Sequence, residues 1–402
     1  MGRLVVAAAV AGWAIPIVAL VNSVVPEPYM DEIFHVPQAQ QYCRGDFLTW
    51  DPMITTPPGL YYVSLAYVAS FFPVAWMFRA ADTFDVLCST AALRSTNVIM
   101  AMICAVLFHD LLLCIRPGIG ERKATTYAIL VALYPVHWFF TFLYYTDVAS
   151  LAAVLAMYLF CLKKQFWISA MFGAVSILFR QTNVIWIIFF AANGAISYIQ
   201  GLYPEDNISH ENIEPTHQSN KVVSGRDNKI TAQEEAWDIC LKIWNSKCKL
   251  LIAFAPFAVV MVAFVAFIIW NGGIVLGAKE AHVVSPHFAQ FLYFGLVSAA
   301  ALVPWHFTPN QVLDLFHLSG KNKTCSSLAV LVGLGLSFIA VHFFRYYTIP
   351  FVILVLHSPV IGNGKLLALG LLYAAADLFT LVMFLFRPFH WEHEPGTQRF
   401  MW

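Results

Sequence analysis

Long uncharged apolar runs dominate this sequence and restrict its fold more than any other feature. Several reach 18 to 24 residues, which is long enough for a helix to cross a hydrocarbon core of roughly 30 Å. Apolar residues make up 60% of the 402-residue chain and charged residues only 11%, far below the roughly 25% of soluble domains. The sequence therefore predicts an all-α, polytopic integral membrane protein.

Eleven of these runs are candidate membrane spans. They cover 4–25, 92–115, 124–143, 147–162, 166–179, 184–200, 249–270, 289–304, 326–344, 346–360 and 364–386. The first run is longer than the apolar part of a signal peptide, and no small-residue cleavage site precedes Pro26. We therefore interpret it as a retained first span.

A twelfth run, Leu60 to Phe78, is ambiguous. If it does not cross the membrane, Arg3 and the basic turns at 116–123 and 162–165 share the cytosolic side, as the positive-inside rule requires. We therefore place it in the interface. The result is a long first lumenal loop, about 26–91, with two interfacial helices, one near Pro37 that stops at Gly45 and one after Pro57 and Pro58.

Composition divides the chain into three parts. Residues 1–200 form an N-terminal transmembrane module that includes the first lumenal loop. Residues 201–248 are rich in Asn, Ser, Glu and Lys, which is typical of a flexible cytosolic connector. Residues 249–402 form a C-terminal transmembrane module. The formal net charge is zero, so no global field favours nucleic acid as a partner.

Two adjacent carboxylates, Asp31 and Glu32, follow the first span directly. A carboxylate at the membrane surface could act as a general base that takes a proton from an attacking hydroxyl. Alternatively, Asp31 could be a simple helix N-cap. Because neighbouring residues on an ordered element point in different directions, one acid could be the base while the other orients it or binds a sugar.

Other ionisable residues lie at predicted lumenal span ends, where charges are costly and often functional. The cations are Arg94, Arg180, Lys279 and Arg345, and the other polar candidates are His35, Asp147, His282 and His287. Single cations could snorkel to the headgroups, but four together could bind an anionic lipid. Asp147 could cap a helix or face a substrate. No metal cage is indicated, and Cys43 and Cys88 could be bridged or free.

The sequence resembles one known family along nearly its whole length. The matching stretches are "YMDEIFHVPQAQQYC", "WDPMITTPPGLYY", "LRSTN", "PVHWFFTFLYYTDVAS", "RQTNV", "WNGGIVLGAKEAHVV", "FFRYYTIPF" and "GTQRFMW". The family comprises the dolichyl-phosphate-glucose-dependent α-1,2-glucosyltransferases of the endoplasmic reticulum, which have the type C glycosyltransferase fold. The stretches resemble those of plant members.

The resemblance implies a function and a site. The enzyme would add the third, terminal glucose to the diglucosylated dolichol-linked oligosaccharide with inversion, using dolichyl-phosphate glucose as co-substrate and no cofactor. Asp31 or Glu32 would be the catalytic base. Substrate would be bound by His35, Asp147, Arg180, Lys279, His282 and Arg345.

In one place the chain departs from the family. Members usually carry a polar lumenal stretch and about two further spans before the "FRYYTIPF" segment, whereas residue 344 here runs directly into Arg345. Two alternatives therefore accompany the enzyme hypothesis. One is a catalytically impaired form with a binding role, and the other is a secondary transporter, although the sequence shows no internal repeat.

Overall fold

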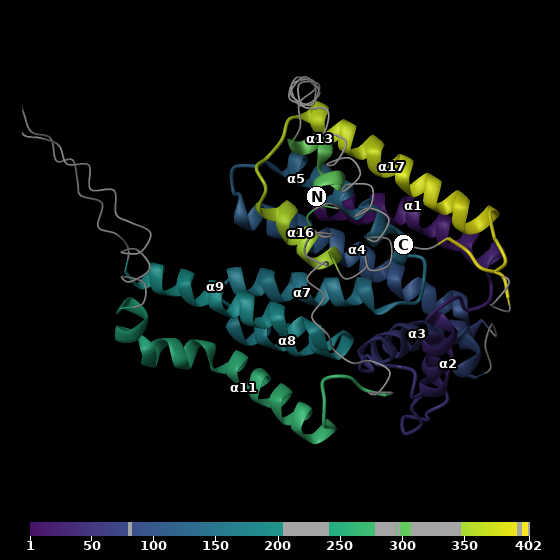
Figure 1. Ribbon diagram of the computed structural model, residues 1–402, viewed down its shortest axis with the longest axis horizontal. Helices are drawn as coiled ribbons and strands as arrows, with labels where there is room; N and C mark the ends of the chain where they lie inside the picture. The colour runs from purple at the N-terminus through teal and green to yellow at the C-terminus, as the bar shows by residue number, and fades with distance from the viewer. Residues whose placement is uncertain are drawn as a thin grey trace, which may run out of the picture.

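The computed structural model describes residues 1–78, 83–203, 241–277, 295, 298–306, 347–391 and 396–400 (Figure 1). In chain order its helices are α1 (Gly2–Val24), α2 (Glu32–Cys43), α3 (Gly59–Met77), η1 (Asp85–Leu87), α4 (Thr90–Ile115), α5 (Glu121–Ala132), α6 (Pro135–Phe140), α7 (Thr146–Leu162), α8 (Phe166–Phe179), η2 (Gln181–Asn183), α9 (Val184–Leu202), α11 (Lys247–Asn271), α13 (Val303–His306), α16 (Thr348–His357) and α17 (Asn363–Phe386). Apart from one isolated bridge between Phe389 and Gln398, these residues form no β-structure. The all-α prediction is confirmed for this part of the chain.

Five helices are long and apolar enough to cross a membrane: α1, α4, the η2–α9 segment, α11 and α17. Shorter apolar helices include α7, α8 and α16. The predicted span 326–344 lies outside the described residues, as does half of 289–304. A multi-pass membrane protein is therefore supported, and the number of eleven spans stays a prediction.

Proline interrupts two of the predicted spans. The run 124–143 is not one helix but two, because Tyr134 takes an extended ψ of 121° before Pro135 begins α6, as the residue before a proline commonly does. The run 346–360 is also shorter than predicted, since α16 ends two residues before Pro359. Both predictions relied on hydropathy and gave too little weight to proline.

Helices α1 and α4 lie antiparallel and define two ends of the bundle. At one end, the Arg3 guanidinium lies 2.7 Å from a carboxylate oxygen of Asp110. At the other, the Arg94 guanidinium donates to the Asn22 side chain at 3.0 Å. We refer to these as the Arg3 end and the Arg94 end. The chain between α1 and α4 therefore leaves and re-enters the bundle at the Arg94 end.

Helix α3 lies across the Arg94 end and does not run through the bundle. The Tyr67 hydroxyl lies 3.0 Å from the hydroxyl of Ser95 in the first turns of α4. At the start of α3, a Cβ on Gly59 would lie 2.5 Å from the carbonyl oxygen of Leu178, near the end of α8. The absence of a side chain at Gly59 allows this contact. The arrangement agrees with the prediction that Leu60 to Phe78 does not cross with the other helices.

Helix α2 begins earlier than predicted. It starts at Glu32 instead of near Pro37, and it ends before Gly45, whose φ is +83°. The Glu32 carboxylate accepts a hydrogen bond from the N–H of Tyr29 at 3.0 Å. Together with the bond from the Glu32 N–H to the Tyr29 carbonyl at 3.2 Å, this bond closes a turn just before α2, ahead of the proline.

The two ends of the predicted connector come together at the Arg3 end. The Tyr203 hydroxyl, just after α9, lies 3.0 Å from the hydroxyl of Ser246, just before α11. Residues 241–245, inside the predicted connector 201–248, are helical, and the flexibility and cytosolic placement of the connector stay predictions. Residues 204–240 lie outside the described residues.

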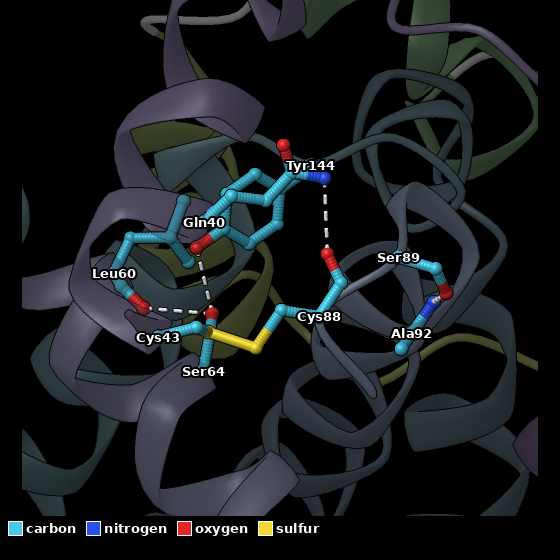
Figure 2. The surroundings of a disulfide bond; sticks show 8 residues. All are labelled: Gln40, Cys43, Leu60, Ser64, Cys88, Ser89, Ala92 and Tyr144. Carbon is cyan, nitrogen blue, oxygen red and sulfur yellow. Dashed lines mark hydrogen bonds between the residues drawn. A yellow bond between two sulfur atoms is a disulfide. The ribbon is translucent and has the colours of Figure 1, made fainter. Parts of the chain in front are cut away.

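A disulfide joins Cys43 at the end of α2 to Cys88 just before α4, across 45 residues (Figure 2). The Gln40 amide donates to the carbonyl of Cys88 at 3.1 Å, and the Ser64 hydroxyl of α3 lies 2.8 Å from that of Tyr144. The bridge resolves an alternative that the sequence left open. Disulfides persist in oxidising compartments and are rare in the cytosol.

We expect the double substitution Cys43→Ser and Cys88→Ser to lower the free energy of unfolding by about 4 kcal/mol, because an open loop of this length gains chain entropy when unfolded. Thermal unfolding of the purified protein measures the loss. The matched control is Cys114→Ser, which changes an exposed free cysteine. Equal stability of the two variants would contradict the prediction.

Candidate functional site

A fully buried ion pair anchors the Arg94 end of the bundle. The side chains of Arg94 in α4 and Glu32 in α2 are both 0% exposed. Two parallel bonds join them, from Nε to Oε1 at 2.9 Å and from Nη2 to Oε2 at 2.6 Å. Such a bidentate, charge-assisted pair fixes orientation as well as distance.

The hydrogen-bonding groups of this pair are fully used. Besides its two bonds to Glu32, Arg94 donates to the Asn22 amide oxygen, the Val25 carbonyl at 2.6 Å and the Glu27 carbonyl at 3.0 Å. These bonds account for the five N–H donors of a guanidinium. Arg94 therefore neither snorkels to the headgroups nor binds a lipid anion, which corrects both interpretations made from the sequence.

The carboxylate of Glu32 is equally occupied. Its Oε1 also accepts from the backbone N–H of Tyr144 at 2.6 Å, and its Oε2 accepts from that of Tyr29 at 3.0 Å. Four hydrogen bonds fill the roughly four lone-pair sites of a carboxylate. Glu32 thus joins the start of α2, α4 and the segment before α7.

Asp31 occupies a different environment from its neighbour. It is half-buried at the N-cap position of α2, with helical φ and ψ of −60° and −19° and without a side-chain cap bond. The preceding Met30 has a left-handed φ of 54°, an uncommon conformation for a residue other than glycine. The backbone N–H of Asp31 donates to the Tyr145 hydroxyl at 3.0 Å. The N-cap interpretation is therefore correct for the position of Asp31, but its side chain makes no capping bond.

His35 lies one helical turn after Asp31, so the two residues share a face of α2. Its Nδ1 atom lies 2.6 Å from the Tyr61 hydroxyl, and the Tyr61 and Tyr145 rings lie 5.9 and 6.5 Å from the imidazole. Burial raises the pKa of Tyr61 well above its usual value, so this phenol stays protonated. Asp31 and His35 thus lie beside two aromatic rings.

A second arginine–carboxylate pair lies at the start of α7. Arg180 donates from Nη2 to the Asp147 carboxylate at 2.7 Å and from Nε to the Thr146 hydroxyl at 2.9 Å. Asp147 is buried, and its other oxygen, Oδ1, has no hydrogen-bond partner within the described part of the chain. Because a buried polar atom without a partner is costly, this oxygen is a candidate contact for a substrate.

Asp147 and Arg180 line a cavity of about 370 Å³. Its other walls come from α7, from the η2–α9 segment and from the start of α16, and include Ser150, Asn183, Trp186 and Thr348. Hydroxyl, amide, charged and aromatic groups are all present. Such a mixture suits the hydroxyls and apolar faces of a sugar.

The segment from Tyr144 to Asp147 connects the acidic residues with this cavity. Tyr144 bonds to Glu32, Tyr145 bonds to Asp31, and Asp147 bonds to Arg180. This backbone is not helical before α7, yet it is buried in the protein, as irregular backbone at membrane depth must be. Asp31, His35, Asp147 and Arg180 therefore lie at the same end of the bundle.

Not every predicted site residue can be located. Lys279, His282 and Arg345 lie outside the described residues, as does His287. Sequence reasoning missed Tyr61 and Tyr145, although Tyr145 stands in the "LYYTDVAS" stretch that was singled out for Asp147. Within the described ranges, no group of three His, Cys, Asp or Glu residues is placed to hold a metal ion.

Known proteins match this chain over most of its length. A model of the DIE2/ALG10 family matches residues 25–352. An Arabidopsis thaliana protein named Dol-P-Glc:Glc(2)Man(9)GlcNAc(2)-PP-Dol alpha-1,2-glucosyltransferase is 41% identical over 510 aligned positions, covering all of both chains. Proteins of the same name from Homo sapiens and Gibberella zeae are 28% and 32% identical, and the alignments cover 94% and 78% of this chain and 93% and 48% of those proteins. No solved structure matches.

The Arabidopsis alignment also bears on the length of this chain. Its 510 positions exceed the 402 residues present here by 108. At least that many positions of the relative therefore have no counterpart in this chain.

Proposed function

Since this chain belongs to the DIE2/ALG10 family, we propose that it transfers glucose from dolichyl-phosphate glucose to the diglucosylated dolichol-linked oligosaccharide. It is a hexosyltransferase that forms the terminal α-1,2 linkage of this precursor with inversion. The observation that carries the proposal is the 41% identity with a glucosyltransferase of that name over the full length of both chains. The site at the Arg94 end supports it, because carboxylates, a guanidinium and aromatic rings gather there.

Asp31 is the general base in this proposal. An oxygen of the acceptor hydroxyl attacks the anomeric carbon of glucose, and the bond from that carbon to the phosphate oxygen breaks. The electron pair of the broken bond leaves with the lipid phosphate, and the hydroxyl proton passes to the Asp31 carboxylate. One base and one direct displacement are sufficient for inversion.

The choice of Asp31 over Glu32 rests on hydrogen bonding. All four acceptor positions of Glu32 are occupied, and its side chain is fully buried. To accept a substrate proton, Glu32 would have to give up bonds to Arg94 or to the backbone. Glu32 is thus a positioning residue that holds the start of α2, while the half-buried Asp31 carries the proton.

The remaining candidates divide between sugar and phosphate. His35, beside Tyr61 and Tyr145, would bind a sugar hydroxyl, and the Oδ1 atom of Asp147 would accept from another. Arg180 is placed to stabilise the charge that develops on the leaving phosphate. Lys279, His282 and Arg345 remain candidates for the same phosphate. The scheme uses no cofactor, since dolichyl-phosphate glucose is a co-substrate.

We further propose that the Arg94 end faces the lumen of the endoplasmic reticulum. The disulfide lies at this end, whereas Arg3, Arg122 and Lys123 gather at the other, as the positive-inside rule expects for the cytosol. On this assignment α2 and α3 are interfacial helices of a first lumenal loop. The family fold would be type C, with about eleven spans.

Expression of the chain in cells that lack this glucosyltransferase tests the function. We expect the mass of the lipid-linked oligosaccharide to rise by one hexose, from the diglucosylated to the triglucosylated form. The full-length relative is the positive control. Because the chain lacks at least 108 aligned positions, failure to add glucose despite correct membrane insertion would favour the impaired, binding form over the enzyme.

A further inference from the structure

A large groove lies away from the glucosyl site, between α5 and α17. It has a volume of about 730 Å³. Its walls are mainly apolar and comprise Thr126, Ile129 and Leu130 of α5, Leu133 just after α5, and Leu366, Leu367, Gly370 and Leu371 of α17. One end is polar and is formed by Arg122, Lys123 and Asn363. We refer to it as the α5–α17 groove.

The length of the groove matches one leaflet of a bilayer. Its α5 wall runs from Arg122 to Leu133, which at 1.5 Å per residue is about 16 Å. Half of a hydrocarbon core of roughly 30 Å is about 15 Å. The leucine side chains that form the wall include Leu367 and Leu371, which are 66% and 64% exposed. An acyl chain of one leaflet could therefore lie along the whole wall.

The polar end of the groove is positively charged. Arg122 and Lys123 make no ion pair with an acid among the described residues. The neighbouring Glu121 does not neutralise them, because its carboxylate accepts from the N–H of Gly2 at 2.7 Å and lies 3.4 Å from the N-terminal amine. The N-terminus of α17 begins at Asn363, and the N–H groups and dipole of a first helical turn also favour an anion.

We propose that the α5–α17 groove binds one anionic glycerophospholipid from the leaflet at the Arg3 end. Its phosphate lies between Arg122, Lys123 and the first turn of α17, and one acyl chain lies along the leucine wall. Basic sites between transmembrane helices at the cytoplasmic face recognise such headgroups. This site is separate from glucosyl transfer, and only its assignment to the cytosolic leaflet rests on the orientation proposed above.

Native mass spectrometry of the purified full chain tests the proposal. The protein is incubated in mixed micelles with palmitoyl-oleoyl phosphatidylserine or with phosphatidylcholine of the same chains. We expect one phosphatidylserine to remain bound per chain, in preference to phosphatidylcholine. The double substitution Arg122→Gln and Lys123→Gln should weaken retention on the order of thirtyfold, since each cation near anionic lipid contributes a factor of about five.

Two further variants separate the headgroup from the acyl chain. Leu367→Trp fills the groove without changing its charge and should also reduce retention of phosphatidylserine. Lys247→Gln with Lys249→Gln removes two charges from the first turn of α11, outside the groove, and should leave retention unchanged. Equal binding of both lipids, or equal loss in the α11 control, would overturn the proposal. In a third incubation with dolichyl phosphate, retention of that lipid in preference to phosphatidylserine would overturn the choice of lipid.

Discussion

The substitution Asp31→Asn is expected to lower glucosyl transfer about a thousandfold while the protein folds normally. A positioned general base commonly contributes 10² to 10⁴ in rate, and an amide in place of the carboxylate cannot take the acceptor proton. The half-buried Asp31 side chain makes no capping bond to α2, so the helix start should persist. The rate is measured per folded molecule, with dolichyl-phosphate glucose and the diglucosylated acceptor.

Two carboxylate-to-amide changes serve as comparisons for Asp31→Asn. Glu27→Gln lies in the same loop on an exposed residue and should leave the rate unchanged. Glu32→Gln should lower the amount of folded protein, with a smaller effect on the rate of the molecules that fold. If folded Glu32→Gln loses transfer and Asp31→Asn keeps it, the two roles must be exchanged.

Sequence reasoning located the acidic pair but could not divide the work between its members. Asp31 and Glu32 are adjacent and chemically alike, so composition and spacing treat them equally. The two acids differ in their contact with Arg94. This residue lies 62 positions from Glu32 in the sequence and, of the two acids, bonds to Glu32. That contact depends on how α1, α2 and α4 pack, and no local pattern encodes it. For the same reason Arg94 was grouped with the lumenal cations, although all its donors are used inside the protein.

The charges of the loops between spans predicted the fold well, because the membrane restricts which side each loop can occupy. Charge asymmetry between loops was enough to predict that Leu60 to Phe78 stays out of the bundle, because only one placement puts Arg3 and the basic turns on one side. Hydropathy alone failed at Pro135. The residues on both sides of Pro135 are apolar, so hydropathy predicted one continuous span over 124–143. The proline nevertheless interrupts the helix.

The second large effect is expected at the buried pair. Arg94→Met should lower the free energy of unfolding by about 3 to 5 kcal/mol, the usual cost of leaving one buried charge without its partner. The substitution also removes donors from the carbonyls of Val25 and Glu27. Because the pair joins α2 to α4, its loss should release the start of α2. Thermal or detergent-induced unfolding of the purified variant measures the change.

A double-mutant cycle shows whether the loss arises from this pair. Arg94→Met combined with Glu32→Gln should be less destabilised than the sum of the single variants, by up to about 3 kcal/mol, because residues in direct contact are not additive. The comparison pair is Arg180 and Asp147, which lines a cavity and is less deeply buried. Arg180→Met should therefore lower the free energy of unfolding less than Arg94→Met does, but it should lower the rate of glucosyl transfer more. If the two arginine variants behaved alike, the division between a structural pair and a substrate-facing pair would have to be abandoned.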